Sequence, residues 1–308
     1  MTIYFIFSLY CVLVILFIIF NFAYNQKNQI DYEYYKVNNS LFSKKIGENS
    51  NNCVKSINCK NKTNSENHFM TYFVIQNNKH EFLVSSIIFH NLKSYTFGKN
   101  YFFTDKMCDD FMKEFDKKTY SAYDNLIPKA YKSDLWRLCI LYKYGGLYTD
   151  ISLKITQNID YFKNYDFVLC EDTNKGDIYN AILYFKKPKH PLLKFWIEEI
   201  VENIKNKKYG SNALDITGPK CLGKLLLQMY PIQWKHGENF FKKEKILFLQ
   251  CKYYKKHIFE PGYNTQIFHN EKVIIERNRD YKNMKKYYSK KSKTNSYNDL
   301  WNKKKVYQ

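Results

Sequence analysis

The chain has 308 residues, of which 45% are hydrophobic, so it can bury the core of one large domain or two small ones. Its formal net charge of +20 would suit a nucleic-acid-binding protein. However, 46 of its 49 basic residues are lysine, spread along the chain, whereas phosphate-binding faces favour the arginine fork. The composition therefore argues against nucleic acid as a partner, and attraction to an acidic surface stays open.

The N-terminal residues predict a membrane segment. Residues 3–20 carry no charge and are mainly Ile, Leu, Phe and Val. About 18–22 such residues span a bilayer core as a helix. A cleaved signal peptide would have a basic start, a shorter apolar run and a small-residue cleavage site, and none of these is clear. We therefore predict an uncleaved transmembrane signal-anchor over residues 1–22.

A polar, Asn-rich segment without sustained periodicity follows at residues 23–68 and predicts a flexible stem. The signals for membrane orientation conflict. Lys27 after the apolar run favours a cytosolic body, whereas glycosylation sequons at Asn38 and Asn61 favour a lumenal one.

The chain has eight cysteines and no CxxC pair, and its seven histidines lack metal-ligand spacing, which argues against a zinc site. Cys53 and Cys59 are close enough in sequence to form a disulfide in an oxidising lumen. Three cysteines in apolar surroundings are expected to be inert core thiols, namely Cys139, Cys170 and Cys221.

Strand and helix patterns alternate over residues 69–308. We expect strands at residues 70–76, 101–104, 147–149, 166–170 and 181–185, and helices at 81–92, 109–115, 130–144, 192–205 and 220–229. The last residues are expected to form a helix or tail packed back on the domain. This alternation predicts an α/β fold with ligand sites at the carboxyl ends of strands.

The helix expected at residues 130–144 leads directly into a short strand. Four apolar residues recur on one helical face: Leu135, Leu138, Cys139 and Tyr142. Gly145 and Gly146 follow, and glycine adopts the positive φ of a helix C-cap without steric cost. The strand after them ends at Asp150.

Three charged residues are thereby brought near one strand end. Asp134 and Arg137 are neighbours on a helix because they are three residues apart. A buried arginine is costly unless paired, so an ion pair alone could explain both residues. A paired arginine can nevertheless also bind a ligand, and carboxylates such as Asp150 can hold Mg²⁺ or Mn²⁺.

At these residues the sequence resembles a known family. Residues 130–137 (AYKSDLWR) and 144–152 (YGGLYTDIS) resemble the donor-binding block of the DXD-containing glycosyltransferases of family 32, related to the yeast initiating α-1,6-mannosyltransferase. The usual form of that block is SDxxR…GGxYxDxD. Weaker resemblances occur in the right order at YFFTD (101–105), IYNA (178–181), PKHP (188–191), TGP (217–219) and YNDLW (297–301), so roughly residues 70–305 are covered.

The resemblance implies a GT-A-like fold, a Rossmann-like mixed sheet flanked by helices. It also implies retaining transfer of a hexose or N-acetylhexosamine from a UDP- or GDP-sugar to a glycan, glycolipid or glycoprotein. Asp134 and Arg137 would contact the donor sugar, and Asp150 the ribose, the sugar and metal-bound water, so these three are the expected catalytic residues. Further substrate-binding residues carried over are Tyr148, Asn180, Thr217 and Gly218.

The resemblance further implies a divalent cofactor, Mn²⁺ or Mg²⁺, held at Asp150 and the residue two positions later. That second position is an aspartate in the usual motif and is Ser152 here. A neutral hydroxyl is a poorer ligand for a hard cation. Glu171 or Asp172 could substitute, although an ordinary polar strand terminus is the simpler interpretation of that pair.

With its anchor, such an enzyme is expected to be a single-pass type II membrane protein with the catalytic domain in the lumen of the ER or Golgi. Two alternatives remain. Ser152 would suit a nucleotide-sugar- or carbohydrate-binding protein of the same fold that has lost turnover. The charge of +20 would suit a basic surface-binding protein.

Residues 218–225 (GPKCLGKL) nearly spell a phosphate-binding P-loop. Leu225 stands where Ser or Thr would bind Mg²⁺, and Pro219 removes a backbone N–H from the phosphate cradle. The sequence therefore argues against a kinase or ATPase.

Overall fold

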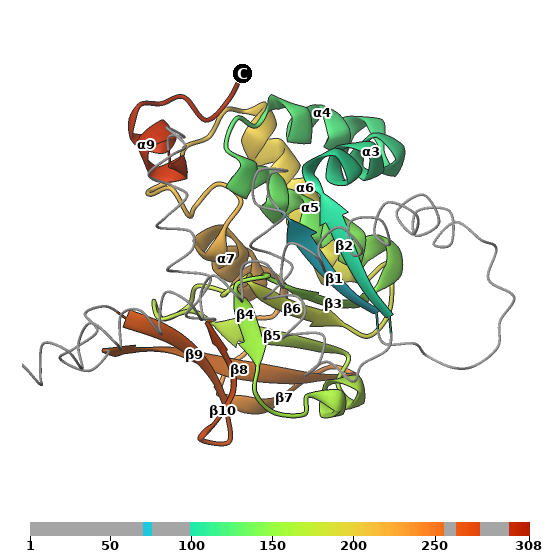
Figure 1. Ribbon diagram of the computed structural model, residues 1–308, viewed down its shortest axis with the longest axis vertical. Helices are drawn as coiled ribbons and strands as arrows, with labels where there is room; N and C mark the ends of the chain where they lie inside the picture. Colours follow the sequence, from blue (N-terminus) through green and yellow to red (C-terminus); the bar gives the residue numbers. More distant parts are fainter. Residues whose placement is uncertain (1–69, 76–98, 256–262, 278–295) are drawn as a thin grey trace, which may run out of the picture. The chain divides into compact units, whose positions relative to one another are not determined.

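The computed structural model describes residues 70–75, 99–255, 263–277 and 296–308 (Figure 1). Every described residue belongs to one compact unit within residues 63–308. The predicted anchor, the stem, Cys53, Cys59 and the helix expected at 81–92 lie outside the described residues. No helix in the described ranges has both the length and the hydrophobicity that a membrane crossing requires.

The described chain alternates strands and helices and then continues mainly as strands (Figure 1). The strands are β1 (Met70–Ile75), β2 (Lys99–Thr104), β3 (Gly146–Thr149), β4 (Leu153–Ile155), β5 (Phe167–Glu171), β6 (Ile182–Phe185), β7 (Gly237–Phe241), β8 (Glu244–Lys255), β9 (Tyr263–His269) and β10 (Lys272–Arg277). The helices are α3 (Asp105–Phe115), α4 (Lys117–Asn125), α5 (Lys129–Tyr144), the 3₁₀ helix η2 (Asp160–Asn164), α6 (Pro191–Lys205), α7 (Pro219–Met229) and α9 (Tyr297–Asn302).

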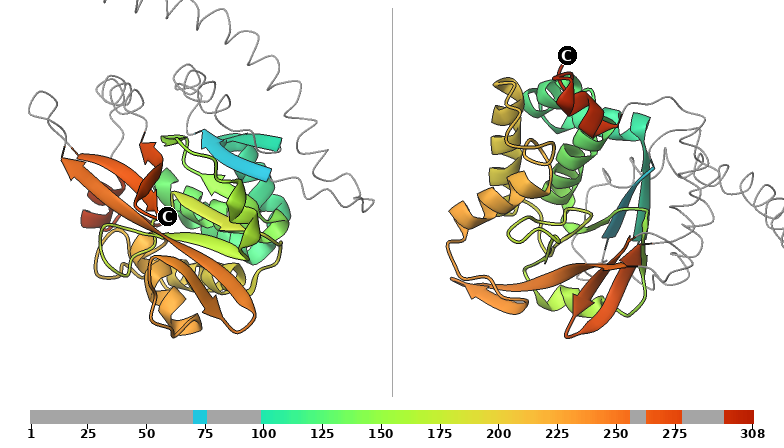
Figure 2. Two further views of the ribbon diagram at one scale, coloured as in Figure 1. Left: turned by 90° about the horizontal axis from the view of Figure 1, so that it is seen from below. Right: turned by 90° about the vertical axis from the view of Figure 1, so that its left-hand side faces the viewer.

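One mixed sheet joins the described strands in the order β2-β1-β3-β6-β5-β8-β9-β10-β4, with β7 paired to β8. The pairs β1–β2, β1–β3 and β5–β8 are parallel, whereas β6 is antiparallel to both β3 and β5. The strands from β8 to β10 pair antiparallel (Figure 2). This arrangement confirms the expected α/β class with a mixed sheet.

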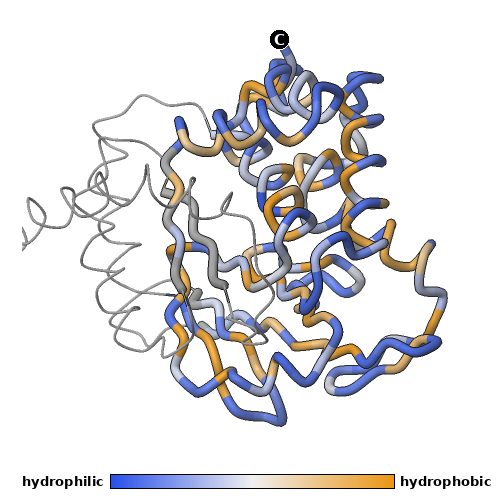
Figure 3. The backbone as a smooth tube through the Cα atoms, turned by 90° about the vertical axis from the view of Figure 1, so that its right-hand side faces the viewer, coloured by the Kyte–Doolittle hydropathy of each residue, from blue (hydrophilic) through white to orange (hydrophobic). Residues whose placement is uncertain are grey.

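The predicted elements that fall on described residues are found with shifted ends, and α5 differs from its prediction in one respect. Its expected apolar face is only part of what is buried, because Trp136, Ile140 and Leu141 on the other faces are also 0% exposed. The helix packs against both the sheet and the neighbouring helices α3, α4 and α6. Figure 3 shows hydrophobic and hydrophilic residues alternating along the helices. A helix covered on nearly every side also buries apolar residues outside the one face that its period indicates.

The position of the short strand β4 in the sheet determines which strand lies next to Asp150. Only residues 150–152 separate it from β3, yet it lies at the far end of the strand order, paired antiparallel with β10. The sheet therefore brings β10 next to the turn that follows β3. Leu153 at the start of β4 is paired with Arg277 at the end of β10.

Candidate functional site

The end of β3 carries Asp150 into a cluster of polar side chains. Antiparallel pairing of β3 with β6 matches Thr149 to Ile182, and the Asp150 amide donates to the carbonyl of Ala181 at 2.8 Å. Asn180 therefore lies just beyond the end of β3. The amide of Leu153 donates back to the carbonyl of Asp150 at 2.9 Å, closing the turn that contains Ser152.

Asp134 is held by three neighbours from separate parts of the chain. Its Oδ1 accepts from Nδ2 of Asn180 at 2.9 Å and lies 3.2 Å from Nη2 of Arg137. Its Oδ2 accepts from the hydroxyl of Thr217 at 2.9 Å. A Cβ on Gly218 would lie 3.6 Å from the same oxygen, so the start of α7 is packed against this carboxylate. The structure thus brings Asp134, Arg137, Asn180, Thr217 and Gly218 together.

Arg137 is buried, and most of its donors are used within the protein. Its Nε donates to the carbonyl of Ser133 at 3.1 Å, and Nη1 donates to the carbonyl of Asn180 at 2.6 Å. Nη1 also lies 3.5 Å from Oδ1 of Asp150. The guanidinium stacks over the ring of Tyr148, with its central carbon 4.4 Å from the ring centroid. The ion pair with Asp134 that the i,i+3 spacing allowed is present.

Asp150 is the accessible carboxylate of the cluster. The hydroxyl of Tyr148 donates to its Oδ1 at 2.7 Å, which together with Arg137 fixes that oxygen. Its side chain is 33% exposed, compared with 13% for Asp134 and 7% for Arg137. A ligand can therefore reach Asp150, while Asp134 and Arg137 support it from behind.

Burial dominates the electrostatics of this cluster. Burial raises the pKa of Asp134 to about 6, and Asp150 adds to the increase, whereas Arg137, Thr217 and Asn180 oppose it. For Arg137, burial lowers the pKa of the guanidinium, but Tyr148, Asp134 and Asp150 raise it by more. Burial also raises the pKa of Tyr148 well above its usual value. Tyr148 and Arg137 therefore keep their protons at neutral pH.

Sequence reasoning missed a second arginine in this cluster. Arg277 at the end of β10 lies close enough to interact electrostatically with Asp150 and Tyr179. Burial lowers the pKa of Arg277, but Tyr179, Asp150 and Tyr253 raise it above its usual value. The available signal was the rarity of arginine, since two of the three arginines in the chain converge on Asp150.

The residues around Asp150 fit a divalent metal poorly. Among the described residues, no group of three or more His, Cys, Asp or Glu side chains is placed to hold a metal ion. Ser152 is neutral and only 7% exposed, and Oδ1 of Asp150 already has two partners. Hard divalent cations take several oxygen ligands, usually including carboxylates. The assignment of Asp150 and Ser152 as metal ligands stays a prediction that the described side chains do not support.

The neighbouring strand end carries Glu171 and Asp172, whose carboxylates bond locally. Glu171 accepts from the amide of Gly176 at 3.0 Å and contacts Nε2 of His236 at 2.7 Å. Asp172 accepts from the amide of Thr173 at 2.7 Å. These contacts agree with an ordinary polar strand terminus. Both acidic residues line a cavity of about 570 Å³ together with Tyr253, and Tyr253 also interacts electrostatically with Arg277.

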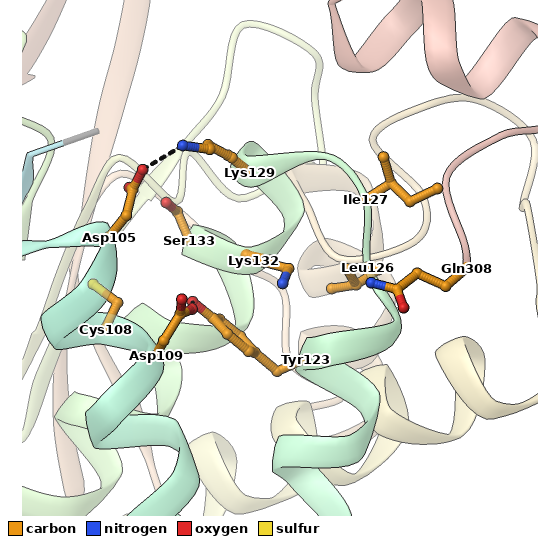
Figure 4. Close-up of a pocket in the computed structure, with 10 residues that line it drawn as sticks. All are labelled: Asp105, Cys108, Asp109, Tyr123, Leu126, Ile127, Lys129, Lys132, Ser133 and Gln308. Atoms are coloured by element: carbon orange, nitrogen blue, oxygen red, sulfur yellow. Dashed lines mark hydrogen bonds and ion pairs between the residues drawn. The ribbon is translucent and has the colours of Figure 1, made fainter. Parts of the chain in front are cut away.

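A second cavity, of about 300 Å³, lies between α3, α4 and the start of α5 (Figure 4). Charged groups in it are already paired with each other. Lys129 contacts Asp105 at 2.5 Å, and the hydroxyl of Tyr123 donates to Asp109 at 2.7 Å. This cavity therefore offers few unpaired charges for a ligand.

Two predicted motifs have structural explanations. The P-loop-like segment is helical from Pro219 onward, and a Cβ on Gly223 would lie 1.9 Å from the carbonyl oxygen of Gly176. Gly223 thus allows close packing of α7 on a loop and forms no phosphate cradle. His190 in the PKHP segment is buried and caps α6, because its Nδ1 accepts from the amide of Leu192 at 3.3 Å.

The C-terminal helix α9 packs back on the domain, as expected. Nε1 of Trp301 donates to the carbonyl of Tyr209 at 2.8 Å, and the rings of Tyr297 and Tyr131 lie 5.9 Å apart. Burial raises the pKa of Tyr297, with smaller contributions from Asp134, Tyr253 and Asp172. Tyr297 therefore packs on α5 through Tyr131.

The predicted core thiols are also buried. Cys139, Cys170 and Cys221 are 0 to 4% exposed and unbridged, and burial raises the pKa of each thiol. Inert core cysteines were expected from their apolar surroundings.

Comparison with known proteins finds a family model that matches the part of the chain carrying Asp134, Arg137 and Asp150. Residues 20–169 match the family model described as the glycosyltransferase sugar-binding region containing DXD motif. Among solved structures, the chain is similar to one described as PaToxG Glycosyltransferase, with 15% sequence identity, a TM-score of 0.40, and coverage of 53% of this chain and 69% of that one. None of the curated proteins compared with the sequence matches it.

Proposed function

We propose that this protein is a glycosyltransferase that transfers a hexose or N-acetylhexosamine from a UDP- or GDP-sugar to a hydroxyl of a glycan, glycolipid or glycoprotein. The observation that carries the proposal is Asp150, an accessible carboxylate fixed by Tyr148 and Arg137 at the carboxyl end of a strand. It lies within the segment that matches the sugar-binding region of DXD glycosyltransferases. The resemblance to family 32 gives the finer assignment of donor class.

In the proposed reaction the anomeric carbon of the sugar exchanges one oxygen for another. The bond from that carbon to the diphosphate oxygen breaks, and its electron pair leaves with the nucleoside diphosphate. The acceptor oxygen forms the new bond on the same face, so the configuration is retained. The acceptor's proton passes to an oxygen of the departing diphosphate, which leaves atoms and charge balanced.

The side chains of this chain would contribute binding and orientation. The free Oδ2 of Asp150 can accept hydrogen bonds from ribose or sugar hydroxyls. Arg137 holds Asp150 on one side and Asp134 on the other, so it fixes the angle at which Asp150 meets a ligand. Asp134 in turn ties α5 to Asn180 and to Thr217 before α7. Preorganised polar groups of this kind lower the cost of reorganisation in the transition state.

The proposal includes an N-terminal anchor. The charge-free residues 3–20 suit a membrane span, and the sequons at Asn38 and Asn61 suit a lumenal stem. We propose that the catalytic unit is held in the lumen of the ER or Golgi by this segment. Glycosidase treatment of the full chain expressed in a eukaryotic cell tests the orientation, since a cytosolic stem would carry no N-glycan.

A second candidate is a sugar- or nucleotide-binding protein of the same fold without turnover. It is favoured by Ser152, where the motif of the resembling family has an aspartate. The same binding contacts around Asp150 would serve it. Only turnover separates the two candidates.

The deciding experiment is to incubate the purified protein with a panel of UDP- and GDP-sugars and to measure release of the nucleoside diphosphate. Parallel samples contain Mn²⁺, Mg²⁺ or EDTA. We expect one donor to be hydrolysed well above the protein-free rate, because water can replace the acceptor. Binding of a donor without release would favour the second candidate, and neither binding nor release would contradict both.

A further inference from the structure

We propose that Arg277, in place of a divalent metal, neutralises the diphosphate of the donor beside Asp150. This inference rests on the proposed function, because it assigns a residue to the diphosphate of that donor. It also gives a reason for the serine at position 152.

Arg277 reaches the site through the pairing of β10 with β4. Ile275 is paired with Ile155 and Arg277 with Leu153, and side chains two residues apart on a strand point to the same face. Ile275 and Leu153 are 0% exposed and belong to the same core cluster as Tyr179. Arg277 therefore points inward at the end of the strand, next to the turn formed by residues 150–152.

Arg277 differs from Arg137 in the use of its donors. Arg137 donates to two backbone carbonyls and contacts two carboxylates. By contrast, Nε of Arg277 is buried without a hydrogen-bond partner among the described residues. The neighbour beside it is the buried hydroxyl of Tyr179, which also interacts with the guanidinium. A buried donor without a partner costs free energy, which a bound anion would recover.

The neighbours of Arg277 place it between Asp150 and the strand end that carries Asp172. Asp150 and Asp172 both interact with Arg277 electrostatically. Asp172 and Tyr253, which both interact with Arg277, line a cavity of about 570 Å³ that offers space for a ligand. A diphosphate bound at Arg277 would leave its attached sugar within reach of Asp150. The guanidinium fork suits two oxygens of one phosphate, which a lysine cannot bind in the same way.

Ser152 and Arg277 form a consistent pair of residues. An aspartate at position 152 would lie one residue from Leu153, the partner of Arg277, and would compete for the guanidinium as an ion pair. With serine there, Arg277 stays available. Two arginines within reach of Asp150 also repel a divalent cation, since like charges in a partly buried site repel strongly. Serine at position 152 thus disfavours a metal, and Arg277 supplies the positive charge that the metal would bring.

Calorimetric titration of the full chain with UDP and with GDP tests the proposal, each in EDTA and in Mn²⁺. We expect the dissociation constant of the nucleotide that binds to differ by less than about threefold between EDTA and Mn²⁺. Arg277→Ala should weaken that binding by about 10- to 100-fold in EDTA, the usual loss for a hydrogen-bonded charge pair. Arg277→Lys keeps the charge and loses the fork of the guanidinium. Its nucleotide affinity should be lower than that of the wild type and higher than that of Arg277→Ala.

Lys272→Ala is the matched control, because it removes one positive charge from the other, exposed end of β10. It should bind as the wild type does, and thermal melting checks that each variant is folded. In the double variant Arg277→Ala with Ser152→Asp, binding should return only with Mn²⁺, because the site then has a second carboxylate and one fewer guanidinium.

Two results would overturn the inference while leaving the proposed function intact. One is nucleotide binding by the wild type that requires Mn²⁺. The other is binding by folded Arg277→Ala and Arg277→Lys that equals the wild type. Absence of any UDP or GDP binding, with or without Mn²⁺, would instead contradict the proposed function together with the inference.

Discussion

Asp134 shows how a single carboxylate connects the site to the stability of the fold. It accepts from Thr217 and Asn180 and pairs with Arg137, so it links α5, the start of β6 and the start of α7. Burial nevertheless raises the pKa of this carboxyl to about 6 from an ordinary 3.8. The cost of desolvation therefore exceeds the gain from its partners.

This raised pKa predicts a pH dependence of stability. Between about pH 4 and pH 6 the folded protein holds the Asp134 proton more tightly than the unfolded chain. The stabilisation is complete below about pH 4 and is lost as the pH rises through 6, a change of about 3 kcal/mol at most. In Asp134→Asn this titration is absent. The free energy of unfolding of the variant minus that of the wild type should thus increase from pH 4 to pH 7.

Urea denaturation of both proteins at several pH values measures that difference, and subtraction cancels the other titrating groups that the two proteins share. A difference that stays constant with pH would contradict the raised pKa of Asp134.

Whether a site residue could be predicted depended on how local its placement is. Asp134 and Arg137 are three residues apart on one helix, so their proximity follows from helical geometry. Asp150 follows from the glycine stop and a short strand. Arg277 follows Asp150 by 127 residues in the sequence (277 − 150). Only the pairing of β10 with β4 brings the two residues close. Sequence periodicity carries no information on such a pairing.

Among the elements, α5 with its glycine stop was the clearest prediction, and the structure confirms the stop. Gly145 has φ +70° and its amide donates to the carbonyl of Leu141 at 2.7 Å. A Cβ there would come within 3.1 Å of backbone atoms of Lys187 and Phe185. Glycine is thus required at this position both by its φ and by the chain passing beside it.

The strands β4 and β7–β10 and the helix α4 were not predicted. The strand β8 contains exposed Tyr253 and Tyr254 and is flanked by lysines, so its alternation is weak. Helix α4 is polar and is defined chiefly by its N-cap, where Asp116 accepts from the amide of Thr119 at 2.8 Å. Both kinds of element depend on tertiary packing more than on sequence period.

The close packing of α7 on the loop at Gly176 gives a prediction about this element. A Cβ on Gly223 would lie 1.9 Å from the carbonyl oxygen of Gly176, so Gly223→Ala must displace the loop. Overpacking of this kind costs about 1–3 kcal/mol, or about 3–10 °C in the melting temperature of a domain this size. Differential scanning calorimetry measures the change.

Leu227→Ala serves as the control, because Leu227 is on the same helix and 51% exposed. Its melting temperature should stay close to that of the wild type. Equal melting of Gly223→Ala and the wild type would show that α7 does not approach the loop as closely as the structure has it.

At the scale of the whole molecule, the order of the strands decides which polar side chains gather at the end of β3. The α/β class and the site at the end of β3 could be predicted, because alternating elements place strand ends at one edge. The return of β10 to that edge could not, since it depends on pairing between segments far apart in sequence. This return places a second arginine beside the accessible carboxylate of the site.

The central claim is that Asp150 binds a nucleotide-sugar for transfer, and the turnover of Asp150→Asn tests it most directly. With the donor that the wild type hydrolyses, the variant should lose more than about 100-fold in kcat, because the amide replaces the charge that Tyr148 and Arg137 orient. Asp160→Asn, at a carboxylate in η2 that accepts a hydrogen bond from Nδ2 of Asn158, should stay within about twofold. Folded Asp150→Asn with wild-type turnover would contradict the account.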